Sequence, residues 1–244
     1  MFANLFRSAP LVDDATLNLM QQVHCWALEQ FGHEHFAQQV KLVPPTNNYF
    51  PERISNVDEM AAALARRMAN YAGISHWPLA VTTDTTAPLQ LPAALTGPRS
   101  TESQPTSAEP QPQQAVVLRY NPLQASDPQA MIASHAQQFG ALLLALATEP
   151  PPVNELQIPL VAELLAVHLG FGIQLANSAF VFAGGCGGCK RSAAGRVAYL
   201  NQDEALMALA LFCHHKQIGT SEVTPHLHKH LRAVYKRGVR QLAN

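Results

Sequence analysis

Apolar residues recur every three or four positions along much of the chain, which is the spacing of helices that bury one face. In the first third, this pattern predicts helices over residues 15–30 and 56–70, each preceded by Asp or Asn residues that can cap its start. A short apolar run over residues 40–43 predicts a strand. Pro44–Pro45 then keeps the chain extended, because proline fixes φ and disfavours helix in the residue before it.

The second half of the chain shows the same helical periodicity. We expect helices over residues 128–147, 159–176, 202–216 and 221–242. The first of these has proline in its first turn, where the missing N–H costs nothing, and it must end before the prolines at 150–152.

Residues 86–114 differ in composition from their surroundings. They are dense in Pro, Ser, Thr, Gln and Glu and poor in large apolar side chains, so they cannot offset the entropy of ordering, and we predict a flexible insertion. Two β-prone runs flank it, at residues 79–83 and 115–120. We interpret them as the strands of one hairpin, with a linker between two domains as the alternative. The chain then divides into a helical part at 1–85, the insertion, and a helical part at 115–244.

Composition and charge narrow the class of protein. Of 244 residues, 48% are hydrophobic and 14% charged, with a formal net charge of −1 and a pI near 6.8. This balance favours a buried core and gives no reason to expect nucleic acid or an anionic membrane as a partner. The N-terminus has no signal-peptide core, and the longest apolar run, residues 141–147, is far short of the ~20 residues that span a bilayer. We expect a cytoplasmic protein.

The helix predicted over residues 128–147 carries a histidine on its apolar face. At about 100° per residue, His135 shares that face with Met131, Phe139 and Leu142. Such a histidine is usually a core residue with one hydrogen bond. The string DPQAMIASHAQQFGALLLAL, however, resembles the zinc helix of an HExxH metallopeptidase. In that motif two histidines four residues apart bind zinc, and the glutamate between them activates the bound water.

The resemblance extends to a bacterial family related to the gluzincins. Segments 44–54, 158–180, 195–212 and 227–243 are similar to parts of that family, so the resemblance covers most of the chain outside the insertion. It implies an α+β fold that is mostly α-helical, with a zincin-like helical core and a small β-hairpin or sheet.

The residues that zinc hydrolysis requires are missing from the matching positions. His135 stands at the first histidine, but Ala136 replaces the general base and Phe139 the second histidine. In the downstream helix the resemblance places Pro159 at an acidic ligand position, while Glu163 keeps a later acid. Because a catalytic zinc needs three protein ligands, the resemblance implies a pseudo-metallopeptidase without zinc here. These four vestigial positions, His135, Ala136, Phe139 and Glu163, leave no catalytic set, and we expect Glu163 to hydrogen-bond His135 or backbone.

Cys186-Gly-Gly-Cys189 is a second candidate site. Two-residue spacing lets two thiolates bind one metal or form a disulfide, but no second CxxC completes a structural zinc site. Candidates for the further ligands are Cys213 with His214 or His215, Cys25 with His24, and the histidines at 226, 228 and 230. An inert loop pair, a zinc site and a thiol-redox pair all stay open.

Three hypotheses of function follow. The leading one is a catalytically inactive metallopeptidase-like protein that binds an unknown protein or peptide in the former cleft. The second is a metal-binding or redox protein that uses Cys186 and Cys189. The third is an enzyme with a repurposed site, which requires His135 and Glu163 to share an open pocket.

Overall fold

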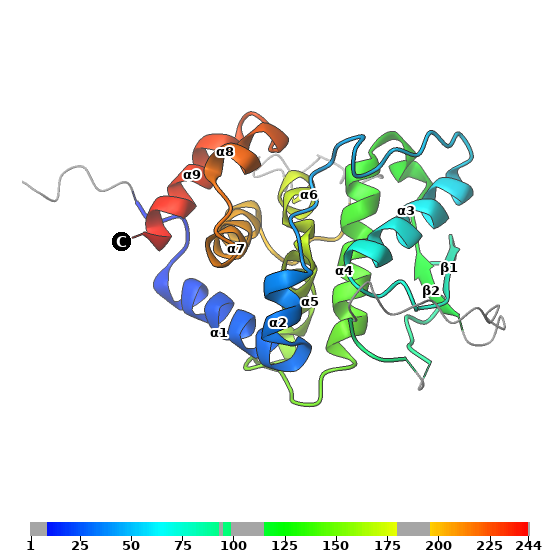
Figure 1. The fold of residues 1–244 in the computed structure, drawn as a ribbon, viewed down its shortest axis with the longest axis horizontal. Helices are drawn as coiled ribbons and strands as arrows, with labels where there is room; N and C mark the ends of the chain where they lie inside the picture. Colours follow the sequence, from blue (N-terminus) through cyan, green and yellow to red (C-terminus); the bar gives the residue numbers. More distant parts are fainter. Residues whose placement is uncertain (1–8, 93–94, 99–114, 180–195, 244) are drawn as a thin grey trace, which may run out of the picture.

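The chain forms a mostly helical structure with one small parallel sheet (Figure 1). The computed structural model describes residues 9–92, 95–98, 115–179 and 196–243. The predicted class, α+β and mostly α-helical, is confirmed at this level. The elements are α1 (Asp14–Phe31), α2 (His33–Gln38), α3 (Val57–Tyr71), β1 (Leu79–Thr82), β2 (Val116–Arg119), η2 (Pro122–Ser126), α4 (Pro128–Leu144), η3 (Glu155–Gln157), α5 (Ile158–Ala166), η4 (Val167–Phe171), α6 (Gly172–Ser178), α7 (Gln202–His215), α8 (Thr220–Val223), η5 (Thr224–His226) and α9 (Leu231–Leu242).

The helices α1, α3 and α4 begin at capping side chains. The side chains of Asp13, Asn56 and Asp127 each accept a hydrogen bond from the backbone N–H three residues later, at 2.7, 3.0 and 3.2 Å. These bonds satisfy N–H groups that have no partner inside the helix. The predicted starts of α1, α3 and α4 are therefore confirmed.

The central layer of the molecule is formed by α4, α5 and α6. Figure 1 shows α1, α2 and α7–α9 on one side of this layer and α3 with the sheet on the other. The helices α4 and α5 approach so closely that a Cβ added at Gly140 would lie 1.9 Å from the carbonyl oxygen of Ala162. Only glycine fits at this crossing, which fixes how α4 and α5 lie side by side.

The two strands are parallel, so the predicted hairpin is wrong. Leu79 pairs with Val116 and Thr82 with Arg119. A parallel pair requires a crossover of about a dozen residues or more, and residues 83–115 are long enough to make one. Strand propensity alone does not distinguish the two directions, because both present the same alternating faces.

Part of the predicted insertion packs against the core. Its three leucines are partly buried there, and the indole Nε1 of Trp77 donates a hydrogen bond to the carbonyl oxygen of Thr96 at 2.9 Å. These leucines are Leu89, Leu91 and Leu95. Residues 99–114 lie outside the described part of the chain, so the flexible insertion stays a prediction there.

The helix predicted over residues 159–176 is interrupted at Gly170, which has a φ of 97°. A Cβ on Gly170 would lie 2.0 Å from the carbonyl oxygen of Lys41, and the Gly170 carbonyl accepts from the Val43 N–H at 3.0 Å. Residues 40–43 therefore pack on this helix break, and the strand predicted there is wrong. Their backbone partner is a turn of helix rather than a neighbouring strand.

The helical run Glu155–Ser178 is long and apolar enough to cross a membrane by length and composition. Its most apolar window has a mean hydropathy of 1.7, and 72% of that window is buried inside the protein. A mostly buried core helix passes the same test of length and composition, so the run is weak evidence for a membrane span. Polar residues such as Glu163 and His168 interrupt the run, so its length does not show as a stretch of uninterrupted apolar residues.

The C-terminal helix predicted over residues 221–242 is broken into two parts. Pro225 lacks an N–H, and Leu227 is extended, with φ −84° and ψ 145°. Asn177 of α6 holds the break, since its amide donates to the His226 carbonyl and accepts from the His228 N–H, both at 3.0 Å. The single-helix prediction is wrong because a distant side chain satisfies these backbone groups.

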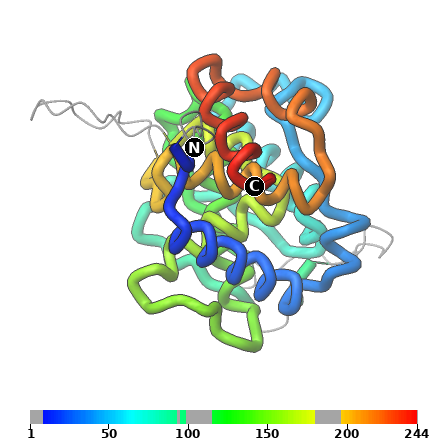
Figure 2. The backbone as a smooth tube through the Cα atoms, turned by 90° about the vertical axis from the view of Figure 1, so that its left-hand side faces the viewer, coloured from blue at the N-terminus to red at the C-terminus, as the bar shows by residue number. Residues whose placement is uncertain are grey.

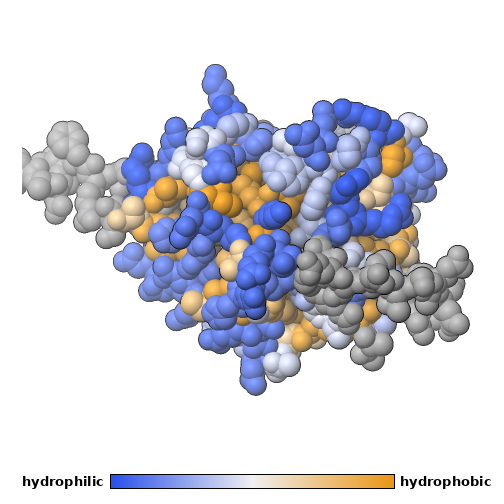
Figure 3. Space-filling view, viewed as in Figure 1, coloured by the Kyte–Doolittle hydropathy of each residue, from blue (hydrophilic) through white to orange (hydrophobic). Residues whose placement is uncertain are grey.

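The first described residues lie beside the end of the chain, as Figure 2 shows. The Gln241 amide of α9 accepts from the Leu11 N–H at 2.6 Å and donates to the Val12 carbonyl at 2.8 Å. On the face drawn in Figure 3, hydrophilic residues dominate and hydrophobic residues appear in smaller patches between them.

Candidate functional site

His135 belongs to α4, and its side chain lies in the core beside α3. Its side chain is fully buried, and within the described residues neither ring nitrogen has a partner in hydrogen-bonding geometry. Burial lowers the pKa of His135 to about 4, and the backbone of Ala61 on α3 offsets only part of this. Neighbouring Ala136 and Phe139 are also fully buried. The ring is therefore neutral at pH 7 and does not reach solvent.

Glu163 is also fully buried, and its partners lie away from His135. It forms an ion pair with the Arg196 guanidinium, and its two oxygens accept from the N–H groups of Tyr199 and Leu200 at 3.1 and 2.8 Å. The hydrogen bonds expected for this carboxylate thus go to backbone and to Arg196. Because His135 and Glu163 are both closed off from solvent, the hypothesis of a repurposed catalytic pocket around the two falls.

An open groove of about 600 Å³ lies beside β2. One face of α4 forms its base, with the start of α5 and residues 196–199 on the other side. The α4 side chains in the groove are Ser134, Gln137, Gln138, Ala141 and Leu144, and the α5 side chains are Ile158, Pro159 and Ala162.

The groove is not the cleft that the HExxH resemblance predicts. At about 100° per residue, the α4 face that lines it is centred about 120° away from His135. The close crossing at Gly140 places the α4 face next to the first turn of α5, so Pro159 lies in the groove while Glu163 points inward. Sequence periodicity identified the buried face of α4 but did not single out the half-buried face beside it.

The backbone of β2 is capped in this groove by a side chain. The Gln138 amide accepts from the Arg119 N–H at 2.8 Å and donates to the Arg119 carbonyl at 2.7 Å. These are the two bonds that a neighbouring strand would make, so Gln138 protects the open edge of the sheet at this residue.

The charge on the described lining of the groove is positive, and part of that lining is exposed apolar surface. None of its lining residues in the described ranges is acidic, and Arg196 is already neutralised by Glu163. The Arg119 guanidinium donates one hydrogen bond, to the Thr85 carbonyl at 3.2 Å, and forms no ion pair with any described carboxylate. Val197 and Tyr199 line the groove with 51% and 49% of their surface exposed.

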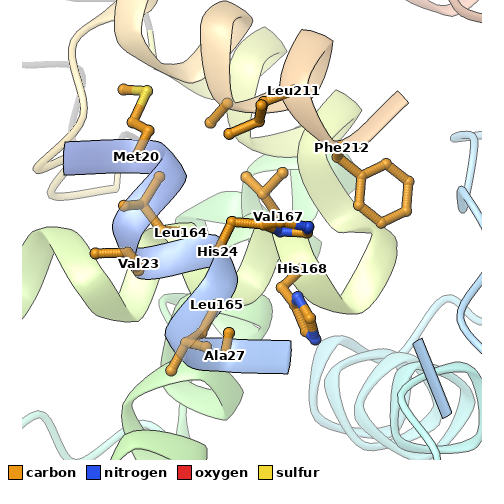
Figure 4. A pocket seen from close by; sticks show the side chains of 11 residues that line it. Met20, Val23, His24, Ala27, Leu164, Leu165, Val167, His168, Leu211 and Phe212 are labelled. Carbon is orange, nitrogen blue, oxygen red and sulfur yellow. The ribbon is translucent and has the colours of Figure 1, made fainter. Parts of the chain in front are cut away.

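A separate cluster of histidines includes His24 on α1 and His168 on η4, which lie beside each other near Phe212 of α7 (Figure 4). The His24 ring is 5.7 Å from the His168 ring and stacks on His215 at 4.1 Å, and Phe36 stacks on His168 at 4.6 Å. His24 and His168 line a cavity of about 20 Å³, which is large enough for one water molecule. These residues come from four separate segments, which is why the sequence did not show them as a group.

The buried histidines of this cluster are neutral at pH 7. Burial is the main cause that lowers the pKa of His24 to about 4 and of His168 to about 3, and neighbouring basic groups lower both further. For His168 these groups are His24, His35 and Lys216. Among the described residues no set of three His, Cys, Asp or Glu side chains is arranged to hold a metal ion.

Cys186 and Cys189 lie outside the described residues. Of the further ligands predicted for them, Cys213 on α7 is 2% exposed and burial raises the pKa of its thiol to about 11, whereas the adjacent His214 is exposed. A protonated thiol is a poor metal ligand. A metal at the cysteine pair stays a prediction.

Comparison of the chain with protein-family models, with characterised proteins and with solved structures gives no match.

Proposed function

We propose that this chain is a non-catalytic, metallopeptidase-like binding protein that holds an extended peptide segment of a partner protein in the groove beside β2. The observation that carries the proposal is the groove itself. Its volume of about 600 Å³ lies within the range of about 300–1,000 Å³ that ligand sites occupy. We propose a cytoplasmic location for the same protein.

The lining of the groove favours a peptide. Amide side chains such as Gln137 suit backbone N–H and C=O groups, since an amide both donates and accepts. Val197 and Tyr199 offer exposed apolar surface to a partner's side chain.

The HExxH-like helix supports a non-catalytic role. Ala136 and Phe139 replace the base and the second ligand, and His135 is enclosed between α4 and α3. We expect no zinc at His135 in the purified protein. Stoichiometric zinc that is lost in His135→Ala would contradict this.

Filling the groove tests the proposal. Ala141 lies half-buried in the groove, whereas Ala145 is exposed at the end of α4. Fluorescence anisotropy with labelled hexapeptide pools should show binding to the wild type, at least tenfold weaker binding to Ala141→Phe, and unchanged binding to Ala145→Phe. Equal binding to all three proteins would reject the groove as the site.

The thiol pair supports a second candidate, a metal-binding or redox function, because the CxxC spacing suits both chemistries. Zinc content and thiol reactivity are compared in the wild type and in the double variant Cys186→Ser, Cys189→Ser. A loss of either in the variant supports this function, and no change in both removes it.

A further inference from the structure

We infer that the groove selects peptides that carry a carboxylate group, and that Arg119 is the side chain that binds it. The inference rests on the proposed function and adds the chemical class of the ligand.

Arg119 is held in place by its backbone and retains unused donors on its side chain. Both backbone groups are bound by the Gln138 amide, at 2.8 and 2.7 Å. The guanidinium has five N–H donors, and only the bond to the Thr85 carbonyl uses one of them. Because the Cα of Arg119 is held in place and its planar guanidinium has free N–H donors, the side chain suits two parallel hydrogen bonds to a carboxylate.

The Arg119 charge in the groove has no acidic partner among the described residues. The two arginines of the groove differ, because Arg196 is enclosed with Glu163 while Arg119 is half-buried without an acidic partner in the ranges described. A half-buried charge is screened less than an exposed one. An anionic ligand group therefore gains more at Arg119 than at an ordinary surface arginine.

A single available cation matches a carboxylate better than a phosphate. Phosphate carries about −1.5 to −2 charges at pH 7 and is usually met by several cations or backbone N–H groups. Among the described lining residues, Arg119 is the one guanidinium that an acid does not already neutralise.

The carboxylate has two sources, an acidic side chain or the C-terminus of the peptide. Three labelled hexapeptide pools separate them: one with an internal Glu and an amidated C-terminus, one without acids and with a free C-terminus, and one without acids and amidated. A fourth pool carries phosphoserine in place of Glu. Anisotropy titrations use the wild type, Arg119→Gln, Arg119→Lys, Ala141→Phe and, as a charge-matched control, Arg66→Gln on the exposed side of α3.

We expect at least one carboxylate pool to bind the wild type about tenfold more tightly than the neutral pool, which corresponds to about 1.4 kcal/mol. Arg119→Gln should abolish this preference, Arg119→Lys should keep part of it, and Arg66→Gln should leave it unchanged. Unfolding midpoints of the variants confirm that each is folded.

The inference is overturned if the neutral pool binds as tightly as the acidic pools, if Arg119→Gln keeps the preference, or if the phosphoserine pool binds more than tenfold tighter than the Glu pool. If, in any of those cases, Ala141→Phe still weakens the binding of all the peptide pools, the proposed function stands and only the carboxylate preference is rejected. Binding that Ala141→Phe does not affect, or no binding of any pool, rejects the proposed function as well.

Discussion

Single residues decide which polar groups can be buried in this fold. Glu163 and Arg196 pair in the core, with side chains 0% and 1% exposed. Glu163→Gln would leave the Arg196 charge without its partner, and breaking a buried pair costs about 3–5 kcal/mol. Urea denaturation should show this loss, whereas Asp203→Asn in the exposed pair with Arg237 should cost less than about 1 kcal/mol. Equal effects at both sites would contradict the account of Glu163.

Gly140 is the second residue with a strong predicted effect. A Cβ there would press on the Ala162 carbonyl, so Gly140→Ala must push α4 and α5 apart. We expect the free energy of unfolding to fall by about 3 kcal/mol or more, the upper range of overpacking. Gly97→Ala is the control, because nothing lies within 4 Å of its Cβ position. A Gly140→Ala protein as stable as the control would contradict the close crossing.

For single residues, the sequence predicted which side chains are buried better than it predicted their hydrogen-bond and ion-pair partners. The periodicity of residues 128–147 placed His135 and Phe139 on a face that is buried. It could not identify Arg196 as the partner of Glu163 or Gln138 as the cap on Arg119, because these pairs join residues distant in sequence. Side-chain pairing of this kind depends on the tertiary arrangement.

At the scale of elements, α1 packs on η4 through two buried histidines, His24 and His168, which must be uncharged to stay buried there. In the folded protein the pKa values of His24 and His168 are about 4 and about 3, below the unfolded value of 6.5. Their contribution to stability is therefore complete above pH 6.5 and is lost as the pH falls from 6.5 toward these values. Each histidine contributes a slope of up to about 1.4 kcal/mol per pH unit in this window.

Unfolding free energies measured between pH 7.5 and 4.5 test this linkage. His168→Phe should make the decline with falling pH shallower, whereas His228→Gln, at an exposed position, should leave it unchanged. A His168→Phe protein with the same slope as the wild type would contradict the neutral buried state of His168.

The elements themselves were predicted well where their signals are local. Caps and periodicity located α1, α3, α4 and α7. The direction of the strands, the break at Gly170 and the break before α9 depend on packing against residues 40–43 and on the Asn177 amide. Gly170 and Pro225 are local signals for the two breaks, but the partners that stabilise the breaks, and the strand direction, cannot be deduced from those segments alone.

At the scale of the whole molecule, the proposed binding site lies on a different face of α4 from the face that carries His135. The HExxH resemblance directed attention to His135, while the structure places the open groove on the face with Gln138 and Ala141. The sequence had no signal for this groove, because its lining joins β2, α4, α5 and residues 196–199. The half-buried residues of α4 identify the helix face that lines the groove, and their burial is known only from the structure.

Chemical-shift mapping of the ¹⁵N-labelled protein with the Glu-containing hexapeptide pool tests the central claim most directly. We predict the largest shifts at the Arg119 N–H, the Gln138 side-chain amide and the Ala141 N–H, which lie on the groove. These shifts should disappear in Ala141→Phe and remain in Ala145→Phe. Shifts centred on α1 or α9, or no shifts at saturating peptide, would contradict the claim that this groove is the binding site.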